Sequence, residues 1–330
     1  MPGTNPLPCS HSTMAYQVGS TKIVLLDTST GRGSVNGPGT TGSFLNQTYT
    51  WSGDSTTGNW TVVSTDTTNS IDPLGPLPVR NLQGMGYDSG STEIVLFGGA
   101  GGSETAGVLN DTWTFSSGGV WAKQAPGTSP FGRYRHQMAD LHGVGVLMFG
   151  GSNVLNFLEE TWLWSGGAGG NWAQLTPGVV PPARVDFAMA GSSATTNVLM
   201  FGGKGINQSF EDTWMWVGTS TGDWVQQFPA VSPPALSEMC MAYDAANTQY
   251  VMFGGRTDET FNGPQTWVWT GGNGGNWHLA TPAVTPSVRV GAQMAYDGTH
   301  VLMFGGSDQY NVNNQTWMWT GGTNGNWQLL

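Results

Sequence analysis

The stretch NVLMFGGKGINQSFEDTWMWVGTSTGDW, residues 197–224, contains the features that decide the fold. A short apolar run ends in Phe201-Gly202-Gly203, a loop leads to Thr213-Trp214-Met215-Trp216, and a glycine-containing turn leads to Trp224. Short runs of β-branched and aromatic residues that are separated by Gly, Asn and Pro are typical of antiparallel strands joined by turns. The stretch therefore predicts three consecutive strands.

The same pattern recurs along the chain with a nearly constant period. Phe-Gly-Gly occurs in steps of 52, 52, 52 and 51 residues, at Phe97, Phe149, Phe201, Phe253 and Phe304. Thr-Trp-x-aromatic follows each time, at Trp113, Trp162, Trp214, Trp267 and Trp317, and a further tryptophan comes within ten residues, at Trp121, Trp172, Trp224, Trp277 and Trp327. A Met-Ala-Tyr-Asp motif or a relative precedes each apolar run, at Met85, Met138, Met189, Met241 and Met294. Each repeat therefore predicts four short strands.

A sixth, degenerate copy opens the chain. Met14-Ala15-Tyr16, an apolar run at residues 23–26, Thr48-Tyr49-Thr50-Trp51 and Trp60 match the repeat, whereas Asp27-Thr28 stands where the glycine pair would be. Four strands in a repeat of about 50 residues are typical of a propeller blade. We predict an all-β, six-bladed β-propeller of antiparallel blades in a single domain, residues 1–330, with approximate blades at 8–66, 78–125, 131–176, 182–228, 234–281 and 287–330. Because the last repeat ends on a complete fourth strand, each blade is expected to be contiguous in sequence.

The repeat resembles the kelch repeat, because Gly-Gly closes the second strand, a loop and a Trp-bearing third strand follow, and another Trp comes about ten residues later. The resemblance covers residues 8–330 and implies a kelch-type propeller. It does not imply one activity, since kelch propellers include oxidases, epimerases, cytoskeletal binders and ubiquitin-ligase adaptors, and a fold does not determine a function.

The composition excludes several classes of partner. Only 9% of the 330 residues are charged, and the net charge is -11. An acidic surface repels a phosphate backbone and anionic lipid, so we expect no nucleic-acid partner. No apolar run is long enough to span a bilayer, so membrane insertion is not expected either. The five histidines and two cysteines show no convincing ligand spacing, and we predict no metal and no cofactor.

Arginines occupy equivalent positions in four repeats. Each lies five residues before the repeated methionine, at Arg80, Arg133, Arg184 and Arg289. In a propeller the first strand of each blade lines the central channel, so these positions fall on one rim. An arc of arginines would bind a carboxylate, a sulfate or an acidic sugar. The alternative is that each arginine stabilises its own blade by packing on a tryptophan or donating to loop carbonyls, because a repeated residue usually serves the repeat.

Residues that differ from blade to blade are better candidates for function. Arg135, Asp186, Glu238 and His11 occupy one equivalent position, and His136 follows Arg135. With the four repeated arginines, these residues form the predicted ligand-binding set. Asp186 and Glu238 lie on adjacent blades and are the only pair of carboxylates that we nominate for catalysis, since glycoside hydrolysis needs two.

The sequence favours a non-enzymatic binding or structural module that recognises a glycan or protein partner through the loop face or the arginine-lined funnel. A carbohydrate-active enzyme (hydrolase, lyase or oxidase) that uses the funnel is one alternative, and an intracellular kelch adaptor is another. Few charges and many Thr, Ser, Asn and Gly residues suit a secreted, cell-surface or virion protein. Whether the chain acts as a monomer or as a subunit of a larger assembly stays open.

Overall fold

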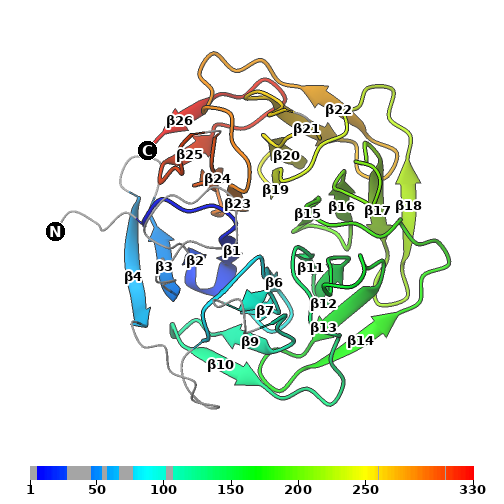
Figure 1. Ribbon diagram of the computed structural model, residues 1–330. Helices are drawn as coiled ribbons and strands as arrows, with labels where there is room; N and C mark the ends of the chain where they lie inside the picture. The colour runs from blue at the N-terminus through cyan, green and yellow to red at the C-terminus, as the bar shows by residue number, and fades with distance from the viewer. Residues whose placement is uncertain are drawn as a thin grey trace.

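The computed structural model describes residues 6–27, 46–53, 58–66, 77–101, 107–258, 260–308 and 310–330. Six four-stranded antiparallel sheets are arranged around a central axis as the blades of a propeller (Figure 1). The predicted fold class is confirmed: every blade is contiguous in sequence, and the described residues contain no α-helix, only a three-residue 3-10 helix at Val18–Ser20.

The strands of each blade follow the chain from the axis outward. Blades 1 to 3 comprise β1 (Thr13–Gln17), β2 (Lys22–Asp27), β3 (Asn46–Ser52), β4 (Asn59–Asp66); β6 (Gly84–Asp88), β7 (Glu93–Phe97), β9 (Thr112–Phe115), β10 (Trp121–Gln124); and β11 (Gln137–Leu141), β12 (Gly145–Phe149), β13 (Thr161–Ser165), β14 (Asn171–Leu175). Blades 4 to 6 comprise β15 (Ala188–Gly191), β16 (Val198–Phe201), β17 (Thr213–Val217), β18 (Asp223–Gln227); β19 (Cys240–Asp244), β20 (Gln249–Phe253), β21 (Thr266–Thr270), β22 (Asn276–Leu279); and β23 (Gln293–Tyr296), β24 (Val301–Phe304), β25 (Thr316–Trp319), β26 (Trp327–Leu329). A further two-stranded sheet pairs β5 (Arg80–Asn81) with β8 (Ala100–Gly101).

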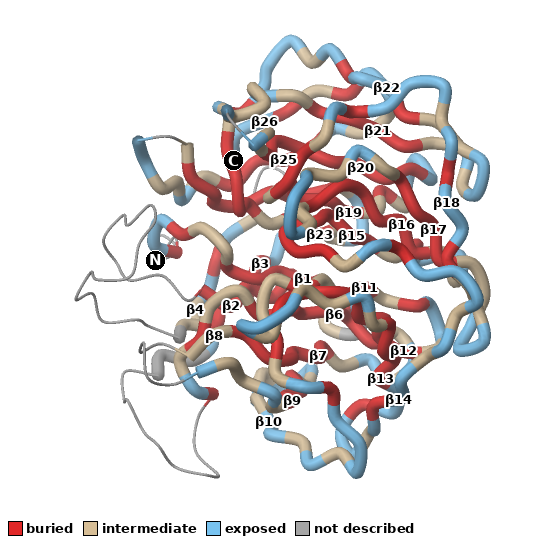
Figure 2. The backbone as a smooth tube through the Cα atoms, turned by 45° about the vertical axis from the view of Figure 1, so that its right-hand side comes forward, coloured by how far each residue is buried: buried red, intermediate tan, exposed pale blue. Residues whose placement is uncertain are grey.

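Burial explains why the second strand of each repeat is a continuous apolar run. Both faces of β16 pack against neighbouring blades, and all four of its residues are fully buried. A strand that is buried on both faces has no polar alternation. The fourth strands lie at the periphery, where buried and exposed residues mix, as the red interior and pale blue outer segments of Figure 2 show.

Neighbouring blades interlock through large and small side chains. Met241 and Tyr243 of blade 5 pack in one apolar cluster with Ala190 of blade 4, and the same arrangement recurs around the ring. The ring of Phe149 lies edge to face with that of Trp224 in the next blade, with 5.3 Å between centroids. Such aromatic pairs add stability beyond the area that they bury.

A closed circuit of hydrogen bonds links the six blades. The indole N–H of each fourth-strand tryptophan donates to a third-strand threonine of the preceding blade at 2.9–3.0 Å, in the pairs Trp60–Thr316, Trp121–Thr48, Trp172–Thr112, Trp224–Thr161, Trp277–Thr213 and Trp327–Thr266. The Trp60–Thr316 bond joins the first blade to the last. Packing and hydrogen bonds between these two blades therefore close the ring without an exchanged strand.

The glycine pair after the second strand has a steric reason. Gly202 and Gly203 have φ values of +66° and +94°. A Cβ atom at Gly202 would lie 2.6 Å from the carbonyl oxygen of Leu236, and one at Gly203 would lie 2.7 Å from that of Val185. Both the backbone conformation and the close approach of the neighbouring backbone therefore require glycine.

Candidate functional site

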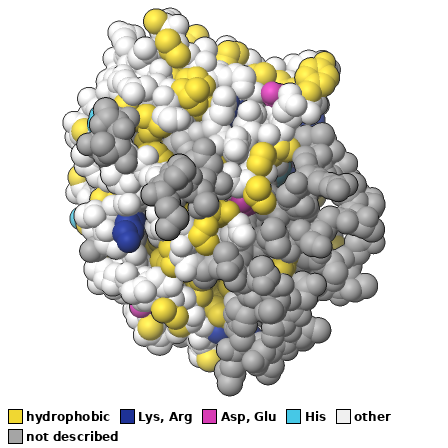
Figure 3. Space-filling model, turned by 90° about the vertical axis from the view of Figure 1, so that its left-hand side faces the viewer, with side chains coloured by type: hydrophobic (Ala, Val, Ile, Leu, Met, Phe, Trp, Pro, Cys, Tyr) yellow, Lys and Arg dark blue, Asp and Glu magenta, His cyan; other side chains and the backbone are white. Residues whose placement is uncertain are grey.

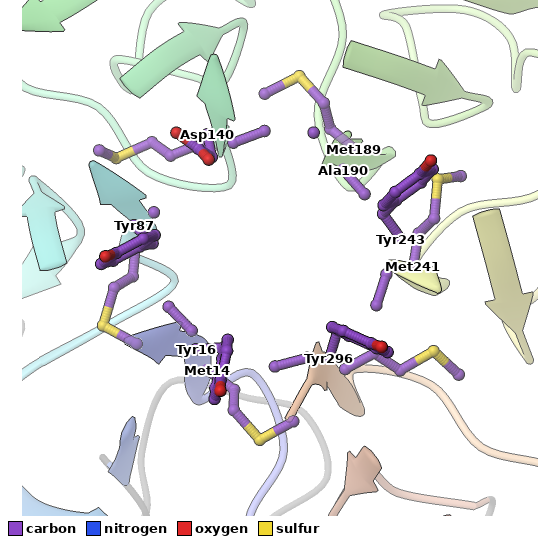
Figure 4. Close-up of a pocket in the computed structure, with 18 of the residues that line it drawn as sticks. Met14, Tyr16, Tyr87, Asp140, Met189, Ala190, Met241, Tyr243 and Tyr296 are labelled. Carbon is purple, nitrogen blue, oxygen red and sulfur yellow. The ribbon is translucent and has the colours of Figure 1, made fainter. Parts of the chain in front are cut away.

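The inner strands enclose a channel of about 580 Å³ along the propeller axis. Small residues from every blade line it, namely Ala15, Gly86, Ala139, Ala190, Ala242 and Ala295. The tyrosines and methionines labelled in Figure 4 belong to the same strands and extend away from the axis, toward the neighbouring blades. Because the bulky side chains pack between blades, the axis itself stays open.

One end of the channel has tyrosines at its mouth. Tyr16, Tyr87, Tyr243 and Tyr296 come from four different inner strands, and Asp140 takes the equivalent place on β11. The Oδ1 atom of Asp140 accepts hydrogen bonds from the hydroxyl and the backbone N–H of Ser89, at 2.8 and 3.3 Å. Burial raises the pKa of Asp140 to about 7, although the bonds from Ser89 act in the opposite direction. A titratable group with a shifted pKa in a cavity marks a candidate functional site.

At the other end, six equivalent residues form a constriction ring, consisting of His11, Leu82, Arg135, Asp186, Glu238 and Gly291. All six have φ values between +55° and +62°. Five of them donate a backbone N–H to the carbonyl oxygen of the ring residue in the preceding blade, at 2.8–3.4 Å. The left-handed conformation costs about 1 kcal/mol or more for a residue other than glycine. The backbone bonds around the axis offset this cost.

Charged side chains of the constriction ring pair with one another. Arg135 donates to Asp186 at 2.6 Å, and Glu238 lies 3.5 Å from His11 and 3.9 Å from Arg256. Burial raises the pKa of Asp186 above its ordinary value, against the effect of Arg135. Burial also acts to raise the pKa of Glu238, but His11, Arg256 and Arg135 outweigh it and the pKa is lowered. The two carboxyls thus have pKa values shifted in opposite directions.

Two glutamines lie between the ring and the channel. Gln137 and Gln293 line both the 580 Å³ channel and a smaller cavity of about 50 Å³ beside the constriction ring. Neither side-chain amide forms a hydrogen bond with any residue that the structure describes. Gln83 differs, because its amide nitrogen donates to the hydroxyl of Thr13 at 3.2 Å.

The arginines expected to face the funnel lie inside the blades instead, and this expectation is corrected. Arg80, Arg133, Arg184 and Arg289 are at most 1% exposed. Arg184 donates to both carboxylate oxygens of Asp212 at 2.7 and 2.8 Å and to the carbonyl oxygen of Gly202 at 2.9 Å. Comparable bonds hold the other three, with Asp111, Glu160 and Gln315 as side-chain partners. Each guanidinium thus forms its hydrogen bonds within its own blade. The arginines stabilise the blades, which is the alternative role that the sequence left open.

The remaining predicted residues do meet at one place. His11, Arg135, His136, Asp186 and Glu238 all line the smaller cavity. Burial lowers the pKa of His136 well below its ordinary value, and its ring lies edge to face with that of Phe97, 5.8 Å between centroids. His136 therefore packs as a neutral side chain, whereas Arg135 keeps 39% of its side chain exposed.

Sequence reasoning missed Asp140, Gln137 and Gln293. The signal was available, because each departs from the repeat: Asp140 stands where four other blades have tyrosine, and the glutamines stand where other blades have Gly84, Ala188 and Cys240. Within the described part of the chain, no group of three or more His, Cys, Asp or Glu residues is placed to hold a metal ion. No helix among the described residues has the length and apolarity to cross a membrane.

Comparison with known proteins supports the fold alone. No protein-family model matches the chain, and no curated protein matches it. A solved structure described as "Structure of YjhT" superposes with a TM-score of 0.70 at 13% identity, over 99% of this chain and 98% of that one. Membership of the kelch family accordingly stays a prediction, while the six-bladed propeller is established.

Proposed function

We propose that this propeller is a non-enzymatic binding module that accepts the end of a glycan in its central channel. The observation that carries the proposal is the channel itself. Its volume of about 580 Å³ falls within the range of small-ligand sites. Its lining is more apolar than polar and includes hydroxyl, amide and carboxyl groups that could orient a ligand, as is usual for such sites.

The charge of the lining supports an uncharged or hydroxylated ligand more than an acidic one. No lysine or arginine is among the described residues that line the channel, and Asp140 is its one carboxylate. An acidic ligand would meet Asp140, with His142 as the one basic side chain of the described lining, its Nδ1 atom 3.9 Å from Oδ2 of Asp140. The lone acid also lacks the second carboxylate that glycoside hydrolysis requires, which favours binding over catalysis.

The proposed place of the module is outside the cytoplasm, as a secreted, cell-surface or virion protein. The described part of the face in Figure 3 carries few charged side chains, in keeping with a chain in which 9% of residues are charged. Neutral hydroxyl and amide groups on such a surface suit contact with glycans. A protein partner that binds the loop face is the competing possibility.

A glycan array tests the proposal with two adjacent substitutions. Ser193 lines the channel mouth and is exposed, so Ser193→Trp should obstruct entry without disturbing the core. Ala194 is also exposed but does not line the channel, and Ala194→Trp is the matched control. We expect wild type and the Ala194 variant to bind the same glycans and the Ser193 variant to lose them. Absence of glycan binding by wild type, or binding that Ser193→Trp leaves intact, would refute the proposal.

A carbohydrate-active enzyme at the constriction ring is the second candidate function. Asp186 has a raised pKa and Glu238 a lowered one, and opposite shifts in neighbouring carboxyls are a property of acid and base pairs. Mass spectrometry of oligosaccharides incubated with wild type, Asp186→Asn and Glu238→Gln tests it. Turnover that both variants abolish would support catalysis, and unchanged oligosaccharides with all three proteins would exclude it for those substrates.

A further inference from the structure

The side-chain amides of Gln137 and Gln293 have no hydrogen-bond partner among the described residues, and they lie at the inner end of the channel, next to the constriction ring. Gln83 Oε1 and both ring nitrogens of His136, in the same small cavity, also have no partner there. Both side chains are partly buried, and both line the two cavities that meet there. Other glutamines of the inner region are engaged: Gln17 donates to the carbonyl oxygens of Thr92 and Phe115, and Gln249 donates to Asp244. Each amide is therefore accessible from the channel and open to a hydrogen-bonding partner that enters it.

Blade packing does not require an amide at this level. The equivalent residues of the other four blades are Thr13, Gly84, Ala188 and Cys240. The position therefore accepts glycine and small side chains. The two glutamines are thus additions to a scaffold that is otherwise built with small residues. They belong to blades 3 and 6, which lie on opposite sides of the axis (Figure 1).

The chemistry of the amide specifies the group that it would hold. Each glutamine offers two donors and one acceptor oxygen, and a sugar hydroxyl both donates and accepts. An ammonium group only donates hydrogen bonds, so it would use only the amide oxygens. A carboxylate only accepts them, so it would use only the amide N–H groups. The apolar wall above them, which includes Ala139 and Ala295, can contact the C–H groups of a sugar ring.

We propose that Gln137 and Gln293 hold the terminal sugar of a neutral glycan, from opposite sides, at the inner end of the channel. This inference rests on the proposed function and specifies its ligand class. Asp140 lines the mouth of the channel, where the next sugar of the glycan would lie.

Isothermal titration calorimetry tests the inference with three classes of sugar. The probes are neutral oligosaccharides that end in hexose or N-acetylhexosamine, the cationic sugar glucosamine and the anionic sugar glucuronate. We expect the neutral sugars to bind wild type and the two charged sugars to bind at least tenfold more weakly or not at all. Preferred binding of glucosamine or of glucuronate would overturn the assignment of a neutral ligand.

Variants at the amides provide the second part of the test. Gln137→Leu and Gln293→Leu remove the hydrogen bonds at nearly constant size, and each should weaken neutral-sugar binding by about 3- to 10-fold. Gln226→Leu makes the same change on the exposed face of β18 and should bind as wild type does. Gln137→Asn, which keeps an amide, should lose less than Gln137→Leu. Near-ultraviolet circular dichroism verifies that each variant is folded.

The outcomes separate the two proposals. If Ser193→Trp abolishes sugar binding while both leucine variants bind as wild type does, the channel is the site but the amides do not recognise the ligand. If wild type binds no sugar of any class, the proposed function itself fails and this inference fails with it. Weakened binding in both leucine variants and not in Gln226→Leu supports the inference.

Discussion

Asp140 shows how one residue departs from the repeat and acquires a distinct environment. Four blades place a tyrosine at this position and blade 4 places Gly191, whereas blade 3 places a carboxyl there that Ser89 of blade 2 binds. Burial raises its pKa to about 7 in the folded protein. The unfolded chain would release the proton near the ordinary value, about 3.9.

The folded state therefore retains a proton that the unfolded state has lost between about pH 4 and about pH 7. The contribution of Asp140 to the free energy of unfolding is therefore highest near pH 4 and falls as the pH rises to about 7. The loss is at most about 1.4 kcal/mol per pH unit. Asp140→Asn removes this titration, so we expect urea unfolding at about pH 5 and about pH 8 to show a smaller decline for the variant than for wild type. Equal declines in both proteins would contradict the assigned environment.

The blade is the scale at which the repeated arginines act. Arg184 ties together the linker before β15, the Gly202 carbonyl after β16 and Asp212 before β17, and Phe210 lies 4.2 Å from its guanidinium carbon. A fully buried arginine that is bonded in this way stabilises the blade only as long as both partners are present, since removal of one leaves the other charge buried and unpaired.

Arg184→Ala should therefore reduce the free energy of unfolding by about 3–5 kcal/mol. Arg256→Ala is the matched control, because its side chain is 33% exposed and its nearest carboxylate oxygen, on Glu238, is 3.9 Å away. A partly exposed pair of this kind contributes about 1 kcal/mol or less. Chemical denaturation of the two variants beside wild type measures the difference, and comparable losses would show that the buried bonds of Arg184 contribute no more than a surface contact.

At the scale of the whole molecule, stability depends on closure of the ring. Blade 1 meets blade 6 through the Trp60–Thr316 bond, through the backbone bonds of Cys9 with Asn313 and Gly306, and through the cluster that joins Met14 to Ala295 and Leu302. Six similar interfaces between blades complete the ring. Loss of one blade would therefore expose an apolar face on each of its two neighbours.

A chain truncated after residue 280 lacks blade 6 and should not unfold cooperatively. The exposed faces of blades 1 and 5 would bind a hydrophobic dye, and the near-ultraviolet signal of the tryptophans should be largely lost. Thermal scans of the truncated and the full-length protein test this expectation. A sharp transition and an intact aromatic signal in the truncated chain would show that five blades suffice.

The sequence by itself determined the number of blades, the strands and the contiguous connectivity, because each follows from a local pattern. The motifs Phe-Gly-Gly and Thr-Trp-x-aromatic indicate strands that are buried on both faces and the turns at their ends. The same strands and turns recur wherever these motifs recur. Even the positive φ of the glycine pair follows from its place at the end of a packed strand.

Only the tertiary structure decided which polar residues face the channel. The acidic partners of Arg80, Arg133 and Arg184 lie 27–31 residues further along the chain, so their pairing is a matter of spatial approach and not of local pattern. The left-handed ring of His11 and its equivalents depends on backbone bonds between blades. The free amides of Gln137 and Gln293 likewise emerge only when all six inner strands surround the axis, because a cavity belongs to no single repeat.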